Sequence, residues 1–246
     1  MTRTEKTIYL FLIDDSISPE TGTQMKSYCE AYFTGATVEL KRPGDALNEK
    51  NSAGKLIKKK TLPVDFVGAH NITTRDKDGI KQLHASEILS ALKQYKVNDT
   101  FCILAMTNQD VYPGEEWNYV FGLANQASGC GIFSFCRHQI GFHGEESKKT
   151  EEEKSRTWLK RSIGTMTHEI GHMFGLKHCT YYECTMNGKN GPGDGAKVKN
   201  KTMCPVCLLK LKLNLKFTDS RARYAALAEA SRAIGLENKA LNYERL

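Results

Sequence analysis

The chain has no apolar run long enough to cross a membrane. A transmembrane helix needs about 20 mainly apolar residues in succession, whereas the longest run here, Thr7–Ile13, has the length of a strand and ends at Asp14. The N-terminal stretch Met1–Lys6 also lacks the apolar core and the small-residue cleavage site of a secretory signal. These absences predict an intracellular, cytoplasmic protein that has no membrane partner.

Aromatic residues are missing from the two clusters of lysine, although the chain carries a net charge of +7. Proteins that bind single-stranded nucleic acid interleave basic and aromatic side chains, because the bases stack on the rings. We therefore interpret both clusters as solubilising loops and expect no nucleic-acid partner. The clustered residues are Lys55, Lys58, Lys59 and Lys60, and then Lys197, Lys199, Lys201, Lys210 and Lys212.

Internal repeats and low-complexity segments are absent as well, so we expect a single domain over residues 1–246. Apolar and β-branched runs predict strands that alternate with helices of regular apolar spacing, and this order is typical of a mixed α/β (α+β) sheet. Residues 42–82 are polar and poorly periodic, and we expect them to be mostly loop. The expected strands are 7–13, 37–40, 101–106 and 131–136; the expected helices are 19–33, 84–95, one that opens at 151–154, and a final one at 222–234, with 208–215 ambiguous.

The helix that opens at 151–154 carries the motif with the clearest chemistry, His168-Glu169-Ile170-Gly171-His172. Residues four apart lie on one face of a helix, so His168 and His172 can present ring nitrogens to one ion. Zinc accepts such nitrogens at about 2.0–2.1 Å, and a catalytic site keeps one position open for water. Glu169 is placed to take a proton from that water as general base.

A third ligand is expected from His178. Gly175 tolerates the left-handed conformation that ends a helix, and the chain can then return three residues later. The short motif alone also occurs by accident on ordinary helices. Gly171 lacks a side chain in mid-helix, which would let a strand or substrate approach.

Eight cysteines are present, and four of them crowd beside the histidines at Cys179, Cys184, Cys204 and Cys207. Two closely spaced pairs that are separated by a polar loop match a closed structural zinc site with four sulfur ligands. A redox pair at Cys204 and Cys207, or buried thiols, are the alternatives. The other cysteines, Cys29, Cys102, Cys130 and Cys136, are expected to be buried as small apolar residues.

Residues 168–207 together resemble the archaemetzincin family of metzincin-clan zinc metallopeptidases. The family string runs from the extended histidine motif to a cysteine, then a second cysteine, a methionine and a CxxC pair, and every fixed position is matched. The matching residues are His168–Cys179, Cys184, Met186, Cys204 and Cys207. The resemblance extends upstream through residues 107–113, 117–122 and 131–137.

This resemblance implies a metzincin-like zincin fold with a twisted mixed sheet and an active-site helix in an N-terminal lobe of about residues 1–175. A smaller C-terminal lobe, about 176–246, would hold the second zinc and a Met-turn, with Met186 beneath the catalytic metal. Gly131–Arg137 would be the edge strand above the cleft, where an extended peptide can pair with it. The implied cofactors are two zinc ions, one catalytic and one structural.

The sequence therefore predicts a zinc-dependent peptidase that acts on a peptide or protein. A catalytically silent, zinc-stabilised peptide-binding protein is the alternative, and a thiol redox protein is a third. The natural substrate, internal or terminal cleavage and the oligomeric state stay open. No residue is clearly placed to stabilise the oxyanion, and Tyr181 and Tyr182 are candidates only through their position in the sequence.

Overall fold

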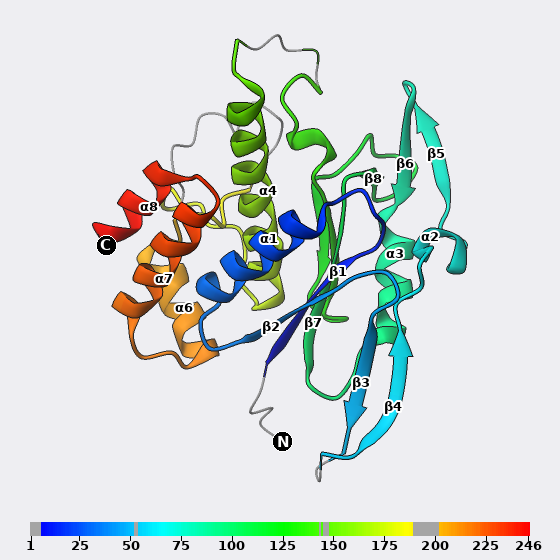
Figure 1. Ribbon diagram of the computed structural model, residues 1–246, viewed down its shortest axis with the longest axis horizontal. Coiled ribbons are helices and arrows are strands. Elements are labelled where there is room, and N and C mark those ends of the chain that lie inside the picture. The colour runs from blue at the N-terminus through cyan, green and yellow to red at the C-terminus, as the bar shows by residue number, and fades with distance from the viewer. Residues whose placement is uncertain (1–5, 52–53, 143, 145–147, 189–201) are drawn as a thin grey trace.

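Five strands form the central sheet of the computed structural model, which describes residues 6–51, 54–142, 144, 148–188 and 202–246 (Figure 1). Four strands run parallel and the fifth runs antiparallel at one edge. The predicted mixed α/β sheet is therefore confirmed, and so are the four predicted strands within it. The order across the sheet is β2 (Thr37–Lys41), β1 (Thr7–Leu12), β7 (Thr100–Thr107), β10 (Cys130–Ser134) and β9 (Gly122–Asn125).

The antiparallel strand β9 forms the sheet edge that contacts helix α4 (Glu151–Met173). The expectation that Gly131–Arg137 forms this edge is wrong, because β10 pairs with β7 on one side and with β9 on the other. All five residues of β10 are buried, as an internal strand requires. Strand β9 has only four residues, three of them half-buried, so it carries no apolar run that would have revealed it.

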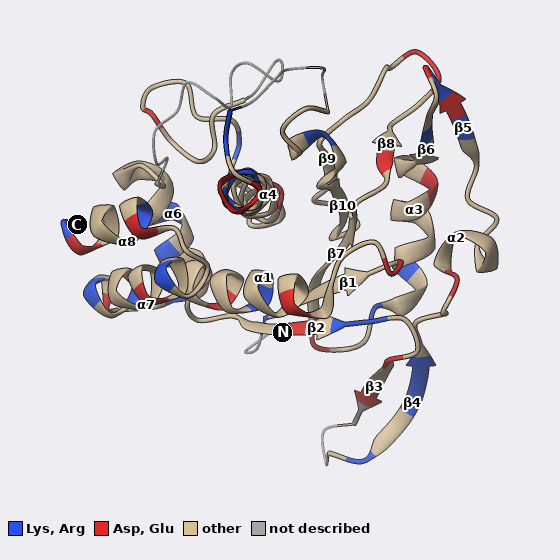
Figure 2. Ribbon diagram, turned by 45° about the horizontal axis from the view of Figure 1, so that its top comes forward, with Lys and Arg blue, Asp and Glu red and all other residues tan. Residues whose placement is uncertain are grey.

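Helices cover both faces of the sheet (Figures 1 and 2). Helices α1 (Pro19–Tyr32) and α4 lie on one face, and α3 (Ala85–Leu92), followed by a 3₁₀ turn at Lys93–Tyr95, lies on the other. Alternate residues of β1 pack into the cores on the two faces of the sheet, because successive side chains of a strand point to opposite faces. Leu10 belongs to the core of the first face, and Phe11 belongs to the core of the second.

Two small sheets occupy the region 42–82, so the expectation that this region is mostly loop is wrong. Strands β3 (Ala46–Lys50) and β4 (Leu56–Thr61) form an antiparallel ribbon, and α2 (Phe66–Ala69) follows them. Strands β5 (Thr74–Lys77) and β6 (Ile80–His84) pair with β8 (Asp110–Tyr112).

Three lysines of the first cluster lie on a strand instead of in a loop, because Lys58, Lys59 and Lys60 belong to β4, whereas Lys55 precedes it. Five of the six β4 residues are exposed, including Leu56 and Ile57. Strand β4 is exposed on both of its sides and needs no alternation of apolar and polar residues, and the described part of β3 buries only Leu47. The sequence pattern therefore did not predict this ribbon. In the second cluster, Lys210 and Lys212 lie on a helix, whereas 197, 199 and 201 fall outside the described residues.

Helix boundaries follow local capping chemistry. The Ser18 hydroxyl accepts a hydrogen bond from the Thr21 N–H, and Pro19 occupies the first turn of α1, as predicted. The His84 ring caps α3 in the same way by accepting from the Glu87 N–H.

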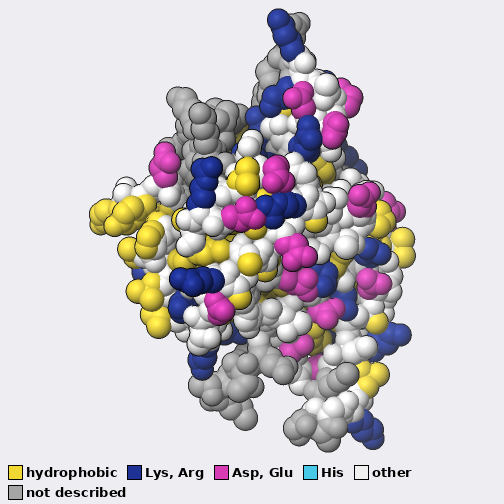
Figure 3. Space-filling model, turned by 60° about the vertical axis from the view of Figure 1, so that its left-hand side comes forward, with side chains coloured by type: hydrophobic (Ala, Val, Ile, Leu, Met, Phe, Trp, Pro, Cys, Tyr) yellow, Lys and Arg dark blue, Asp and Glu magenta, His cyan; other side chains and the backbone are white. Residues whose placement is uncertain are grey.

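Within residues 202–246 the chain forms three helices: α6 (Pro205–Leu215), α7 (Ser220–Ala233) and α8 (Glu237–Glu244). The ambiguous segment 208–215 is thus helical, and the helix predicted at 222–234 is not the final one, because α8 follows after Gly235. Helices α7 and α8 pack on α1: the hydroxyls of Tyr28 and Tyr243 lie 2.7 Å apart, and Arg223 donates to the Tyr32 carbonyl. Figure 3 shows the surface on this side of the molecule, where acidic and basic side chains are interspersed. No described helix combines the length and the apolar character that a membrane crossing requires.

Candidate active site

Helix α4 presents the histidine motif in its last turns. The helix starts at a capping box, in which the Thr150 hydroxyl accepts from the Glu153 N–H and the Glu153 carboxylate accepts from the Thr150 N–H. It ends just before Gly175, whose φ of +79° is a left-handed conformation that glycine adopts without strain. The chain reverses there, as the sequence predicted.

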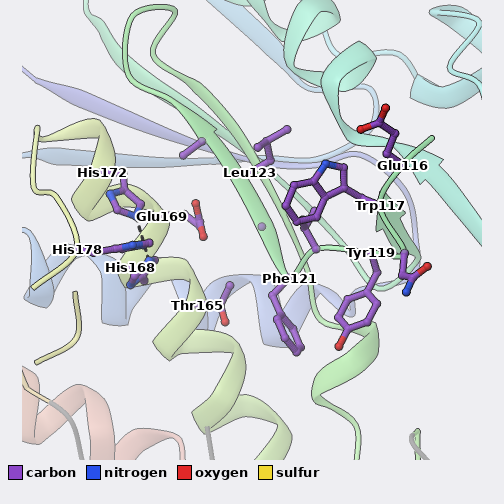
Figure 4. A pocket seen from close by; sticks show the side chains of 14 residues that line it. Glu116, Trp117, Tyr119, Phe121, Leu123, Thr165, His168, Glu169, His172 and His178 are labelled. Atoms are coloured by element: carbon purple, nitrogen blue, oxygen red, sulfur yellow. Dashed lines mark hydrogen bonds between the residues drawn. The ribbon is translucent and has the colours of Figure 1, made fainter. Parts of the chain in front are cut away.

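This reversal brings three imidazole rings together. The ring centroids of His168 and His172 are 4.6 Å apart, and His178 lies 5.3 Å and 5.0 Å from them. One ring nitrogen from each residue lies within 4.8 Å of the others. Figure 4 shows the three rings converging on one side of a pocket.

The protons of two of these rings can be assigned from their partners. His168 Nδ1 lies 2.9 Å from the Thr185 carbonyl oxygen, and His172 Nδ1 lies 2.7 Å from that of Leu176. A carbonyl oxygen only accepts, so each Nδ1 carries the proton and donates it. Burial also lowers the pKa of His172, which favours its neutral form.

In neutral rings with this tautomer, Nε2 presents a lone pair. The Nε2 atoms of His168 and His172 are 3.0 Å apart, so two lone pairs face each other at hydrogen-bonding distance. A cation between them relieves this repulsion, and histidines that ligate metal commonly donate their other ring N–H to a carbonyl in this way. Three neutral imidazole nitrogens are a donor set that suits zinc. The residues therefore fit the metal that the sequence predicted.

Glu169 lies beside the triad and lines the same pocket, where its side chain points away from the helix (Figure 4). Its carboxyl group contacts the backbone of Gly122, the first residue of β9. A Cβ atom at position 122 would lie 2.8 Å from Glu169 Cγ and 2.9 Å from its Oε1. The carboxylate therefore occupies space that only a glycine at 122 leaves open, a relation that no local sequence pattern revealed.

Met186 lies beneath the helix that carries the histidines, and it is fully buried. A Cβ atom on Gly171 would lie 2.5 Å from the Met186 sulfur. The sequence led us to expect a strand or a substrate close to Gly171, but the neighbour is this methionine. The preceding residue, Thr185, supplies the carbonyl that accepts from His168, so this turn both supports and orients the motif.

The four clustered cysteines also converge, with their sulfur atoms within 4.8 Å of one another. No disulfide joins them, since all are free and Cys179 Sγ lies 3.9 Å from Cys204 Sγ, far beyond a bond of about 2.05 Å. The remaining cysteines, Cys29, Cys102 and Cys130, are buried as expected, but Cys136 is only half-buried.

Backbone N–H groups point at these sulfur atoms. Cys184 Sγ accepts from the N–H groups of Met186 at 3.4 Å and Cys204 at 3.3 Å, and Cys204 Sγ caps α6 by accepting from Cys207 N–H. A hydrogen bond from the Tyr181 N–H lowers the pKa of Cys179, whereas burial raises that of Cys184. Four converging sulfurs favour a metal site over an isolated redox pair, which would need only Cys204 and Cys207.

The histidines and Glu169 open onto a cleft of about 670 Å³. Its opposite wall is the segment Glu116–Ala124, and Thr165 of α4 completes the lining. The sequence pointed to residues 117–122 only through the resemblance, and their role as a wall was not predicted. The close spacing of the aromatic residues Trp117, Tyr119 and Phe121 was the signal available. The oxyanion candidates, Tyr181 and Tyr182, are 89% and 54% exposed and are not among the residues that line this cleft.

Comparison with known proteins gives concordant results. Residues 55–213 match the sequence model of Peptidase family M54. Archaemetzincin-2 of Homo sapiens is 34% identical over 230 residues, which cover 86% of this chain and 58% of that protein. Archaemetzincin-1 of Homo sapiens is 28% identical over 240 residues, which cover 86% of this chain and 43% of that protein. The chain thus spans little more than half the length of the first relative and less than half that of the second.

Two solved structures share the fold. The crystal structure of archaemetzincin from Methanopyrus kandleri has a TM-score of 0.57 and 22% identity, covering 88% of this chain and 99% of that one. A zinc-dependent peptidase from Methanocorpusculum labreanum has a TM-score of 0.54 and 22% identity, covering 83% of this chain and 99% of that one. The predicted fold class is confirmed by these likenesses.

Proposed function

Because this chain belongs to the archaemetzincin family, peptidase family M54, we propose that it hydrolyses peptide bonds in the cleft between α4 and the 116–124 wall. One observation carries the proposal: the Nε2 atoms of His168 and His172 face each other beside a carboxylate, within a cleft large enough for a peptide. A purely structural metal site has no need of an adjacent base or of an open cleft.

His168, His172 and His178 would hold the catalytic zinc through one ring nitrogen each. When bound, zinc supplies Lewis acidity, which polarises a carbonyl group and lowers the pKa of a water molecule. The carbonyls of Thr185 and Leu176 keep His168 and His172 in the tautomer whose free nitrogen faces the metal position.

Glu169 would move the protons of the reaction. Its carboxylate would accept a proton from the attacking water and return that proton to the leaving amine, so that one residue serves as base and then as acid. The missing side chain at Gly122 leaves the space that the carboxylate occupies. The edge strand β9 is placed to pair with an extended peptide through its backbone, which would align the scissile bond beside Glu169.

Cys179, Cys184, Cys204 and Cys207 would hold a second, structural zinc. Thiolates that bind zinc lie at about 2.3 Å from it, and four of them close the coordination shell. This site would tie the start of α6 to the turn that carries Met186, because Cys204 and Cys184 lie at those two places. We therefore expect two zinc ions per chain.

The substitution Glu169→Gln tests the proposal. It keeps the size of the side chain and removes its basicity, so we expect two zinc ions per chain and a loss of hydrolysis of about a hundredfold or more. Zinc is measured by elemental analysis, and hydrolysis by mass spectrometry of a diverse peptide library with and without a chelator.

The outcomes separate the candidate functions. The peptidase proposal is supported if the wild type hydrolyses peptides, a chelator abolishes this hydrolysis, and Glu169→Gln lacks it. Two zinc ions without turnover of any peptide indicate the silent peptide-binding protein. Turnover that persists in Glu169→Gln at the wild-type rate removes Glu169 from the mechanism.

A further inference from the structure

Three aromatic side chains line the cleft wall that faces the histidines. Trp117, Tyr119 and Phe121 alternate along the chain, and Figure 4 shows them across the pocket from the triad. Trp117 is 62% exposed, whereas the other tryptophan, Trp158, donates its ring N–H to the Phe135 carbonyl inside the protein. A large aromatic surface left in water beside a catalytic group is typical of a binding site.

Two of the three rings are in contact with each other, and one of them also stacks on a histidine ring. Tyr119 and Phe121 meet edge to face with centroids 5.6 Å apart, and Phe121 stacks on His138 at 4.9 Å with the planes only 7° apart. His138 in turn lies 2.8 Å from the Thr165 hydroxyl on α4, one turn before the histidine motif. The aromatic surface is therefore connected to the helix that carries Glu169.

Arg75 on strand β5 holds the backbone of this wall. Its guanidinium donates to the carbonyl of Trp117 at 2.6 Å and to that of Asn118 at 3.2 Å. Gln82 on β6, fully buried, donates to the same Asn118 carbonyl at 2.9 Å and accepts from Arg75 Nε at 2.8 Å. The region that was expected to be loop thus fixes the path of the cleft wall.

Arg137 holds the wall from the opposite side. Its guanidinium lies 3.5 Å from the centroid of the Tyr119 ring and forms two hydrogen bonds to the buried carboxylate of Asp110, at 2.8 Å and 2.7 Å. A planar guanidinium can stack on a ring and bind a carboxylate with two bonds at once, which lysine cannot do. Gln82 also donates to Asp110, so the two arginines belong to one network.

We propose that Trp117, Tyr119 and Phe121 form an aromatic subsite that selects peptides with a bulky apolar side chain next to the scissile bond, and that Arg75 and Arg137 are its positioning residues. Burial of an apolar side chain against three rings is favourable, whereas an acidic or amide side chain would lose hydration there. The Arg137 charge on Tyr119 also disfavours a second cation at that ring. The inference rests on the proposed peptidase function.

The selectivity is tested with two otherwise identical peptides that carry Phe or Ala at the variable position. We expect the wild-type protein to favour the Phe peptide in kcat/KM by about tenfold or more, and Trp117→Ala to reduce that ratio severalfold. Tyr181→Ala, which removes an exposed aromatic ring outside the described cleft, is the matched control and should keep the wild-type ratio. An unchanged ratio in Trp117→Ala, or preference for a Lys or Glu peptide, would overturn the proposal.

A binding experiment separates this inference from the peptidase function. In the Glu169→Gln background, calorimetry should show tighter binding of the Phe peptide than of the Ala peptide, by about tenfold, and Trp117→Ala should abolish the difference. If no peptide is hydrolysed by the wild type but this difference is found, the subsite stands and the peptidase proposal fails. If the wild type hydrolyses both peptides without preference and binds them equally, the peptidase proposal stands and the subsite fails.

The positioning role of Arg75 predicts an effect on one peptide only. Arg75→Ala should raise KM for the Phe peptide severalfold while leaving kcat, the KM for the Ala peptide and the zinc content unchanged. Lys81→Ala removes an exposed cation from the same hairpin and serves as the control. Equal losses for both peptides would indicate general destabilisation and contradict the positioning role.

Discussion

At the scale of single residues, the reactive side chains are held by neighbours that are remote in the sequence. His168, His172 and Glu169 were predicted because one helix turn brings them together. His178 was predicted because Gly175 lets the chain return after the helix ends. Gly122 and the carbonyl of Thr185 were not predicted, because they reach the site through the sheet and through the turn before Met186. A motif thus identifies the ligands but not the groups that orient them.

Gly122 offers a direct test of this orientation. We expect Gly122→Ala to lower kcat/KM by about ten- to a hundredfold, because the new methyl would displace the Glu169 carboxylate and small misplacements of catalytic groups are costly. The histidines are untouched, so zinc content should stay at the wild-type value. Kinetics with a fluorogenic peptide and elemental analysis measure the two quantities.

The matched control is Gly114→Ala, in the same connection, where a Cβ meets no atom within 4 Å. This variant should keep wild-type kinetics. If Gly122→Ala were as active as Gly114→Ala, then the position of the Glu169 carboxylate would not matter for turnover, and its assignment as the base would lose its geometric support.

At the scale of elements, three of the four strands that the sequence predicts are buried ones. Strands β1, β7 and β10 were predicted because they are buried and therefore carry apolar runs. The ribbon β3–β4 and the edge strand β9 were missed, because they carry no such run. Strand β2 is also half-buried, and it was nevertheless predicted from the segment 37–40. Pairing between distant segments, such as β6 with β8, leaves no local pattern at all.

Helix α4 contains two glycines with opposite expected roles. A Cβ at Gly164 meets no atom within 4 Å, whereas one at Gly171 would press on the Met186 sulfur. We expect Gly164→Ala to raise the free energy of unfolding by about 0.5–1 kcal/mol, since alanine is the better helix former. Gly171→Ala should lower it by about 1–3 kcal/mol through overpacking.

Urea unfolding measures the free energy of unfolding of both variants. The two variants are directly comparable, because each replaces a glycine of the same helix by alanine. A stabilising Gly171→Ala would show that Met186 moves aside without cost. The close packing of Met186 beneath the histidines would then not be needed for the fold.

At the scale of the whole molecule, the expected N-terminal and C-terminal lobes share one hydrophobic core. The same buried cluster contains Leu10 and Phe133 of the sheet, Met186 of the turn, and Leu211 and Tyr243 of the C-terminal helices. A hydrogen bond joins Tyr32 of α1 to Thr185 within this region. We therefore propose that the chain folds as a single cooperative domain.

The cysteine cluster should contribute to that cooperativity. We expect Cys184→Ser to lower the zinc content from two ions per chain to one and to lower Tm by about 10 °C or more, because zinc binding contributes several kcal/mol to folding and each kcal/mol lost shifts Tm by roughly 2–4 °C in a chain of this size. Cys136→Ser is the control, since Cys136 is half-buried and lies outside the cluster.

The course of unfolding tests the single domain at the same time. Tryptophan fluorescence reports on Trp158 of α4 and on Trp117 of the cleft wall, and far-UV circular dichroism reports on all the helices, including α6–α8. Coincident transitions by both probes are expected for one cooperative unit, in the wild type and in Cys184→Ser alike. A dichroism transition that precedes the fluorescence transition would mean that the C-terminal helices unfold separately, and the shared core would then not bind the two lobes into one domain.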